Sequence, residues 1–160
     1  MAEKNKNSKT GNSKNGQESK EKLAVVLVRG LVKVPRPVKN TLFLMNLTRK
    51  NHCVVLENNL VNQGMLAKVK DYITWGEISS ETFTELIQKR GQPFLQREGD
   101  SKSKYTYNCL VVEGKKYKKY FRLNPPRKGF GRKGIKVSFN ASGGLGYRGE
   151  KMNDLIMRML

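Results

Sequence analysis

Histidine and cysteine, the residues that most often carry metal or nucleophilic chemistry, are scarce in this chain, which has one histidine and two cysteines. Cys53 and Cys109 lie far apart and form no CxxC motif, so neither a zinc site nor a disulfide framework is predicted. We expect both to be small buried thiols. If residues 52–57 form a strand, His52 and Cys53 point to opposite faces and cannot hold one metal ion. No metal site is therefore expected.

Acidic residues are also few, 13 in all, and they are scattered along the chain. General acid–base catalysis usually uses a histidine or two carboxylates that are brought together, and the sequence offers little of either. We therefore expect a protein that is not an enzyme and that uses no cofactor. Composition alone leaves open a nuclease that works with tyrosine or lysine, although no motif indicates one.

Long apolar runs are absent, and no stretch approaches the 18 residues that a membrane-spanning helix needs. The first 22 residues contain no Val, Ile, Leu, Phe, Tyr or Trp, so they lack the apolar core of a signal peptide and have nothing to bury. We expect a soluble, cytoplasmic protein in which residues 1–22 are disordered when free. This tail is either simply solvated or an arm that becomes ordered on a partner.

Positive charge is what the chain has in excess, with 32 Lys and Arg and a formal net charge of +19. Such a chain repels itself unless a polyanion neutralises it. An acidic membrane surface would require basic residues on a helix with a broad apolar face, and no such helix is predicted. Nucleic acid is therefore the expected partner, and His52 is expected at the surface or facing RNA.

Hydrophobic periodicity predicts an α+β domain within residues 23–91. The expected order is strand, helix, strand, helix, strand and a further helix, at residues 23–29, 37–47, 52–57, 64–73, 73–78 and from Ser79 or Ser80 to Gly91. Helices between strands normally pack on one face of the sheet. The other face, or the loops at the ends of the sheet, is then left for a partner.

Residues 92–160 are predicted to form a basic extension. The stretch 104–120 is interpreted as a strand, with one buried helical turn at 108–114 as the alternative. Between Glu113 and Glu150 there are eleven Lys and Arg and no acidic residue, with Tyr and Phe interleaved. This pattern favours RNA contact over a merely solvated face, because aromatic rings stack on unpaired bases.

The pattern GxGxxG occurs twice, at 129–134 and 144–149, but neither copy has the context of a dinucleotide site. The first precedes a strand-like stretch, 135–139, and so lacks a helix N-terminus for a pyrophosphate. A C-terminal helix with Met152, Leu155, Ile156 and Met159 on one face follows the second, but no return strand follows. We interpret the second copy as backbone that approaches an RNA phosphate beside Arg148.

The stretch FRLNPPRKGF, residues 121–130, combines two prolines with a basic turn. Pro125 and Pro126 fix an extended geometry and remove two backbone donors, so this segment cannot be a central strand. We interpret it as a stiff elbow that Phe121 and Leu123 anchor to the body of the protein.

Several motifs together resemble one known family: VRGLVKV (28–34), NHCVVLENN (51–59), GMLAKVKDYITWGEI (64–78), LIQKRG (86–91), FRLNPPRKGF (121–130) and GGLGYRGEKMNDLIMRM (143–159). They look like the ribosomal protein family called L-thirty in bacteria and archaea and L-seven in eukaryotes, and specifically its archaeal and eukaryotic branch. The resemblance covers most of residues 23–160. The chain differs from the family at residues 92–120 and in its polar N-terminal tail, residues 1–22.

The resemblance implies a β-α-β-α-β domain with a three-stranded antiparallel sheet and helices on one face, plus a basic C-terminal extension that ends in a helix. It implies a non-catalytic structural protein of the large ribosomal subunit. The expected partners are ribosomal RNA, near the 5S RNA as in the family, and neighbouring ribosomal proteins, with no membrane and no small-molecule substrate. The expected organisation is a tail at 1–22, a core domain at 23–91 and an RNA-contacting extension at 92–160.

The residues expected to contact RNA are the cations of the loops and of the extension, with one aromatic ring. They are Arg29, Lys33, Arg36, Arg49, Lys50, Lys118, Lys119, Arg122, Arg127, Lys128, Phe130, Arg132, Lys133, Lys136 and Arg148. A free RNA-binding regulator or chaperone outside the ribosome is the alternative function, because composition alone does not separate the two.

Overall fold

The computed structural model describes residues 22–95, 99, 101–102, 104, 109–112 and 114–160. The expectation that residues 1–22 are disordered lies outside these residues, except for Lys22, which begins the first strand. No helix in the described part is long and apolar enough to cross a membrane.

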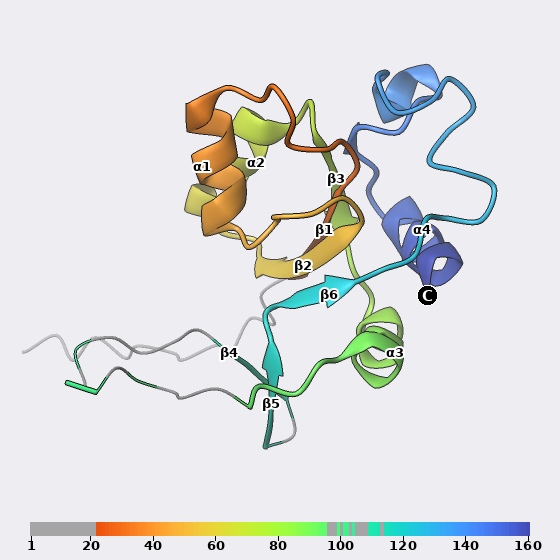
Figure 1. The fold of residues 1–160 in the computed structure, drawn as a ribbon. Helices are drawn as coiled ribbons and strands as arrows, with labels where there is room; N and C mark the ends of the chain where they lie inside the picture. Colours follow the sequence, from red (N-terminus) through yellow and green to blue (C-terminus); the bar gives the residue numbers. More distant parts are fainter. Residues whose placement is uncertain (1–21, 96–98, 100, 103, 105–108, 113) are drawn as a thin grey trace, which may run out of the picture.

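The body of the protein is built on a mixed sheet of five strands in the order β6-β2-β1-β3-β7 (Figure 1). Its centre is β1 (Lys22–Leu27), which pairs antiparallel with β2 (His52–Glu57) and with β3 (Ile73–Glu77). These are the three strands that the sequence predicted. Their β-branched and apolar residues suit a sheet that is covered on both faces.

The prediction of a three-stranded antiparallel sheet is wrong, because the C-terminal part adds a strand at each edge. The strand β6 (Tyr120–Arg122) pairs antiparallel with β2, and β7 (Gly146–Tyr147) pairs parallel with β3. Two short strands from the segment after residue 91 thus belong to the same sheet. Strands of three and two residues carry no period-2 signal, so their pairing could not be predicted from the sequence.

The first face of the sheet is covered by α1 (Arg36–Leu44) and α2 (Leu60–Val69). Side chains alternate along β1, so Leu23, Val25 and Leu27 point to these helices. The predicted first helix is confirmed, with Pro37 near its start. The second helix begins at Leu60, four residues earlier than predicted. Its first two residues, Leu60 and Val61, are exposed, so they are not part of the core-facing pattern used for the prediction.

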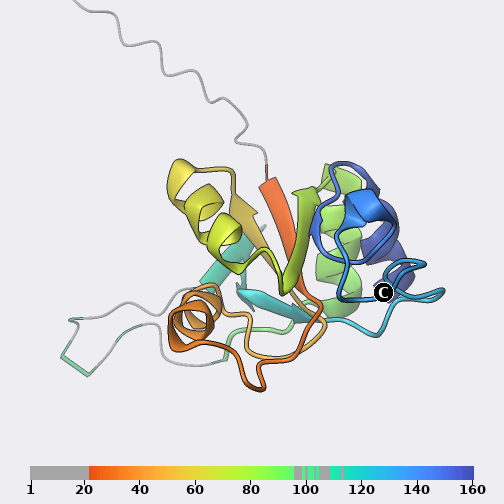
Figure 2. The same ribbon diagram turned by 90° about the horizontal axis from the view of Figure 1, so that it is seen from above.

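The second face is covered as well, by α3 (Ser80–Arg90) and α4 (Lys151–Met159), which pack on Ala24, Val26 and Val28 (Figure 2). The prediction that helices cover only one face of the sheet and leave the other face free for a partner is therefore wrong. The cap of α3 is as predicted, since the Ser79 hydroxyl accepts a hydrogen bond from the Thr82 amide. The four apolar residues predicted for the C-terminal helix are all buried.

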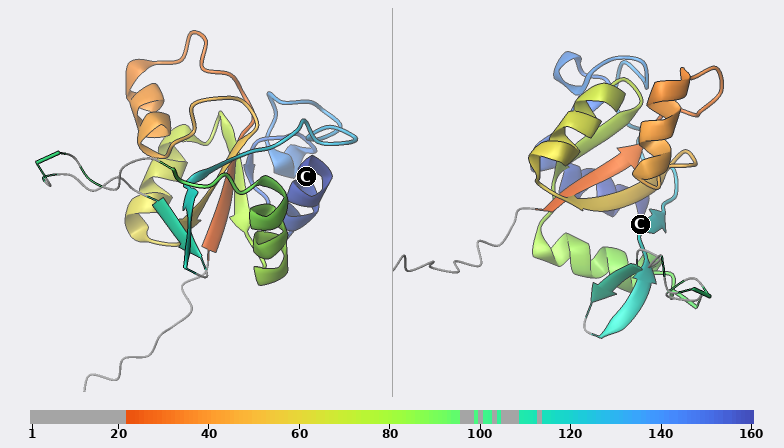
Figure 3. Two further views of the ribbon diagram at one scale, coloured as in Figure 1. Left: turned by 60° about the horizontal axis from the view of Figure 1, so that its bottom comes forward. Right: turned by 90° about the vertical axis from the view of Figure 1, so that its left-hand side faces the viewer.

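A hairpin of β4 (Cys109–Val112) and β5 (Lys115–Lys118) lies beside α3, outside the main sheet (Figure 3). The described residues of 104–120 are thus mostly in strands, as predicted, but they form β4, β5 and the start of β6 rather than one strand. The strand-like stretch 135–139 forms no strand and contributes one bridge, between Ser138 and Leu145, before the short 3-10 helix η1 (Phe139–Ala141).

The two cysteines differ in their surroundings. Cys53 is fully buried, and burial raises the pKa of its thiol to about 12, so the thiol stays protonated and unreactive. Cys109 is only half-buried, so the prediction of two buried thiols holds for Cys53 alone. His52 and Cys53 point to opposite faces, as expected, because each belongs to a different side of β2.

Candidate nucleic-acid interface

The strand connections bring four loops to one end of the sheet. We call these loops, at residues 28–35, 45–51, 70–72 and 123–145, the basic end. Backbone hydrogen bonds join them: the Asn51 amide donates to the Leu27 carbonyl at 2.8 Å, and the Val28 amide donates to the Tyr72 carbonyl at 3.0 Å. The Leu123 amide donates to the Asn51 carbonyl at 3.1 Å. Segments far apart in the sequence therefore form one surface on a rigid support.

The basic end carries far more positive than negative charge. Its ten cations are Arg29, Lys33, Arg49, Lys50, Lys70, Arg127, Lys128, Arg132, Lys133 and Lys136, and Asp71 is its single carboxylate. Arg36 and Arg122 flank it at the start of α1 and the end of β6. Charges of one sign gathered on a surface attract a polyanion and raise the rate at which it associates.

Most of the residues predicted to contact RNA are exposed at this end. The exposed ones are Lys33, Arg36, Arg49, Lys50, Arg122, Arg127, Lys128, Arg132, Lys133 and Lys136. Arg29 is half-buried, because its guanidinium donates to the Asp71 carbonyl at 3.1 Å and lies over the Tyr72 ring. Lys118 ends β5 and Lys119 precedes β6, so both lie outside the four loops of the basic end, and both are half-buried.

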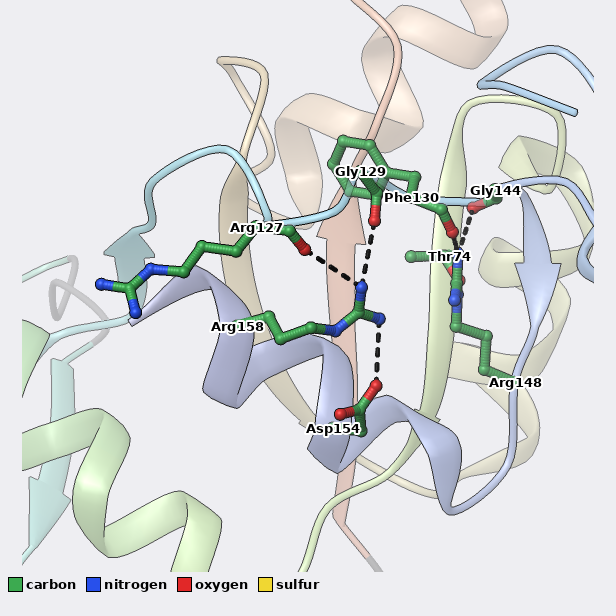
Figure 4. Close-up of polar contacts among 8 residues, drawn as sticks. All are labelled: Thr74, Arg127, Gly129, Phe130, Gly144, Arg148, Asp154 and Arg158. Carbon is green, nitrogen blue, oxygen red and sulfur yellow. Dashed lines mark hydrogen bonds and ion pairs between the residues drawn. The ribbon is translucent and has the colours of Figure 1, made fainter. Parts of the chain in front are cut away.

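Arg148 is buried rather than exposed at this end, and its polar contacts join it to β3 and to the 123–145 loop (Figure 4). Only 6% of Arg148 is exposed, and its guanidinium donates to the Thr74 hydroxyl and to the carbonyls of Phe130 and Gly144. Its Cζ also lies 4.5 Å from the centre of the Phe139 ring. Burial lowers the pKa of Arg148 to about 10, so the side chain is still charged at neutral pH. Its bonds hold the 123–145 loop onto β3.

Arg158 holds the same loop from α4. Its Nη1 donates to the carbonyls of Arg127 and Gly129, each at 3.2 Å, and its Nη2 forms an ion pair with Asp154 at 3.0 Å (Figure 4). The sequence did not predict this support of the loop by Arg158, because an arginine in the last turn of an amphipathic helix is normally exposed to solvent. The carbonyls that it binds are set by the fold.

The proline elbow also packs on α4. The Asn124 amide donates to the Met159 carbonyl at 3.0 Å, and the Arg127 amide donates to the Arg158 carbonyl at 3.1 Å. The last carbonyls of a helix have no partner within the helix, so the elbow caps α4. Phe121 is fully buried and Leu123 is 8% exposed, which confirms the predicted anchoring.

Glycines allow close backbone contacts in and around the two GxGxxG segments, and a Cβ atom on Gly144 would lie 2.9 Å from the Phe130 Cβ. A Cβ atom on Gly131 would lie 2.3 Å from the Gly143 carbonyl oxygen, and one on Gly143 would lie 2.1 Å from the Val137 carbonyl oxygen. Such distances exclude any side chain at these positions. Close contacts within the protein therefore explain these glycines, whereas the other glycines of the two segments are needed mainly for their positive φ. Because Arg148 is buried, it is not available to hold a phosphate beside the second copy.

The predicted surface position of His52 is wrong, since only 5% of this residue is exposed. Its ring stacks on Tyr120 at 5.1 Å between ring centres. Burial, together with the positive charges of Arg122 and Arg49, lowers the pKa of His52 below its usual 6.5. His52 is thus a neutral packing residue under the basic end.

Aromatic residues of the extension are less available for stacking than their sequence pattern suggested. Phe121 is fully buried and Phe130 is 9% exposed, so neither ring presents a face to solvent. Tyr147 is 53% exposed, and its hydroxyl donates to the Glu77 carboxylate. Lys70 was not among the residues predicted to contact RNA, and it lies exposed at the basic end. Its neighbour Asp71 is acidic, so this position does not belong to a run of positive charge in the sequence.

No group of three or more His, Cys, Asp or Glu that could hold a metal ion occurs among the residues the structure describes. The arrangement of the basic end suits the binding of a polyanion. It offers positive charge on loops that backbone bonds and two inward-pointing arginines hold in place.

Comparison with known proteins agrees with the resemblance noted in the sequence. The family pattern of "Ribosomal protein L30p/L7e" matches residues 23–73. The chain is 41% identical to the large ribosomal subunit protein uL30 of Nanoarchaeum equitans, over 86% of this chain and 97% of the relative. It is 40% identical to uL30 of Methanococcus maripaludis, over 86% and 98%, and 38% identical to uL30 of Methanopyrus kandleri, over 83% and 100%. Because this similarity extends over nearly the full length of each relative, the chain belongs to the ribosomal protein L30p/L7e family.

Proposed function

We propose that the basic end is the surface by which this protein binds and stabilises folded ribosomal RNA. As a member of its family, the chain is a structural, non-catalytic protein of the large subunit of the cytoplasmic ribosome. The observation that carries the proposal is the gathering of ten Lys and Arg against one carboxylate in four loops at one end of the sheet. The two helix-covered faces support these loops.

The proposed contacts are to phosphate and 2′-hydroxyl groups more than to bases. A-form RNA presents its shape and backbone to a protein and hides its sequence in a deep major groove. Lys and Arg on loops can reach phosphates on either side of a groove. We include Lys70 in the RNA-binding set and leave out Arg148 and Phe130, whose side chains support the loop from below.

Lys118 and Lys119 are given no part in the main contact, because they lie away from the basic end. A position near the 5S RNA is a further proposal, and it rests on the family resemblance. Crosslinking of the exposed lysines to RNA in purified large subunits would test it, since crosslinks to the 5S RNA are expected and their absence would contradict that position.

The test of the main proposal is incorporation into large subunits. A tagged chain with Arg49→Glu and Lys50→Glu should fall out of the large-subunit peak on sedimentation, because two exposed phosphate contacts are reversed. The same double change at Lys118 and Lys119 is the control and should sediment with the subunit. Equal incorporation of both variants would contradict the proposal. A wild-type chain that sediments mainly away from the subunit would favour a free RNA-binding regulator or chaperone.

A further inference from the structure

A pocket of about 340 Å³ opens at the sheet edge where β7 pairs with β3. The turn after α2 forms one wall, with Lys70 and Asp71, and the segment before β7 forms the other, with Lys136 and Phe139. Trp75 and Tyr147 line it from the two strands. Its size falls within the range of pockets that bind small organic groups.

Aromatic rings make up much of the pocket lining. Trp75 and Tyr147 are register partners on β3 and β7, so their side chains lie on the same face of the sheet. Their ring centres are 6.4 Å apart and the rings are tilted by 51°, so they form one continuous aromatic wall. Tyr147 is about half exposed, and large rings left open in a pocket are suited to stacking with a flat ligand.

The polar groups at the pocket are those that a nucleotide would use. The ammonium groups of Lys70 and Lys136 can neutralise a phosphate, and both residues are exposed. The Asp71 carboxylate can accept hydrogen bonds from the amino group of a base. Because Lys70, Asp71 and Lys136 belong to the basic end, the pocket opens directly beside the surface proposed for the RNA backbone.

We infer that this pocket receives one unpaired nucleobase of the bound RNA. The base stacks on the aromatic wall of Trp75 and Tyr147, and its phosphate lies between Lys70 and Lys136. Protein readout of RNA commonly targets bases outside helices, which stack on aromatic side chains. This inference rests on the proposed function, since it assumes that RNA lies across the basic end.

Trp75 is the single tryptophan of the chain, so tryptophan fluorescence reports on the surroundings of this one ring, which lines the pocket. We would titrate the full chain with penta-adenylate RNA and, separately, with inorganic polyphosphate, which has charge and no bases. Stacking predicts quenching of Trp75 by the RNA and little change with polyphosphate. Equal quenching by both ligands, or by neither, would overturn the inference.

Replacement of one ring tests the same point through affinity. Tyr147→Leu should weaken binding of penta-adenylate by about 5- to 100-fold, the range expected when one base loses its stacking partner. Phe43→Leu is the matched control, because Phe43 is 64% exposed on α1, outside the pocket, and it should bind as the wild type. Thermal unfolding of both variants, with midpoints near that of the wild type, would show that the fold is kept.

Binding of ribosomal RNA measured on the same samples separates the two ideas. Tight, salt-dependent binding of ribosomal RNA with unchanged Trp75 emission would overturn the pocket and leave the proposed function standing. Quenching by penta-adenylate without binding of ribosomal RNA would support the pocket and contradict the proposed function.

Discussion

Single residues beneath the basic end decide whether its loops are held in place. The clearest case is Arg148, whose buried guanidinium has three hydrogen-bond acceptors on two separate segments. The planar fork of arginine can reach all three, and a lysine ammonium is a point charge that cannot match this geometry. Arg148 is therefore a support of the 123–145 loop, and the proposed function gives it no direct contact with RNA.

Arg148→Lys is expected to lower the free energy of unfolding by about 2–4 kcal/mol, since hydrogen bonds to a buried charge are lost. The measurement is urea unfolding of the free protein, without RNA. A residue whose role is to touch RNA would leave this quantity unchanged. An unaltered unfolding midpoint for Arg148→Lys would therefore contradict the assignment of Arg148 as a supporting residue.

His52 makes stability depend on pH in a predictable direction. Its folded pKa is depressed below the usual 6.5, so the unfolded chain takes up a proton more readily than the folded one. Stability is then complete above pH 6.5, decreases as the pH falls below it, and levels off below the folded pKa. The slope is at most about 1.4 kcal/mol per pH unit.

The measurement is urea unfolding between pH 7.5 and 5.5, a window in which His52, as the only histidine of the chain, is the main group to titrate. His52→Phe keeps a ring to stack on Tyr120 and removes the titration. This variant should show a flatter pH profile than the wild type. A profile as steep as that of the wild type would contradict the account of His52.

At the scale of elements, the packing of α4 against β3 depends on a glycine. A Cβ atom on Gly76 would lie 2.3 Å from the Gly149 carbonyl oxygen and 2.9 Å from the Met152 Cβ. The backbone before α4 would have to move away from the strand. Because the same backbone continues from Arg148 and β7, a shift here would also disturb the supports of the 123–145 loop.

Gly76→Ala is therefore expected to destabilise the protein by about 1–3 kcal/mol. Gly64→Ala is the matched control, because Gly64 lies within α2 and a Cβ there meets nothing within 4 Å. That change should stabilise the protein by about 0.5–1 kcal/mol, since alanine favours the helix. Thermal unfolding of the two variants checks both, and a stable Gly76→Ala would count against the close packing.

The elements that could be predicted from the sequence are those with a local signal. The β-branched run of β1, the Ser79 cap of α3 and the i, i+3, i+4 pattern of α4 each indicated their structure without knowledge of the rest. The edge strands β6 and β7 could not be predicted, because their two or three residues are strands only through pairing with distant partners.

The same distinction applies to the candidate site. The excess of Lys and Arg predicted which residues lie on the surface, because charge without a partner must be solvated or meet a polyanion. The inward positions of Arg148, His52 and Phe130 depend on which face of the sheet each segment packs against. The face that each segment packs against depends on where α4 and the 123–145 loop lie in the fold, and no local sequence pattern predicts this.

At the scale of the whole molecule, the helix-covered sheet presents a concentration of positive charge at one end. Helices cover both faces of the sheet, so the loops at its ends are the surfaces left for a large partner (Figure 2). The basic end has one carboxylate, whereas Glu57 and Glu77 lie at the opposite ends of β2 and β3. The proposed function therefore predicts that the basic end faces the polyanion.

The salt dependence of RNA binding tests this central claim most directly. Neutralisation of roughly 6 to 10 phosphates makes affinity fall about 10³- to 10⁵-fold between 50 and 200 mM salt. Each lost phosphate contact reduces the slope of log affinity against log salt concentration by about one. Arg132→Glu with Lys133→Glu, both exposed at the basic end, should thus reduce the slope by about two.

The measurement is binding of purified large-subunit RNA to three proteins over this range of salt: the wild type, the Arg132 and Lys133 double variant, and a variant with Lys118→Glu and Lys119→Glu. The two variants change the net charge equally, so only the position of the charge differs. The account predicts a reduced slope and weaker binding for the basic-end variant alone. Equal losses in both variants, or a shallow salt dependence in the wild type, would contradict it.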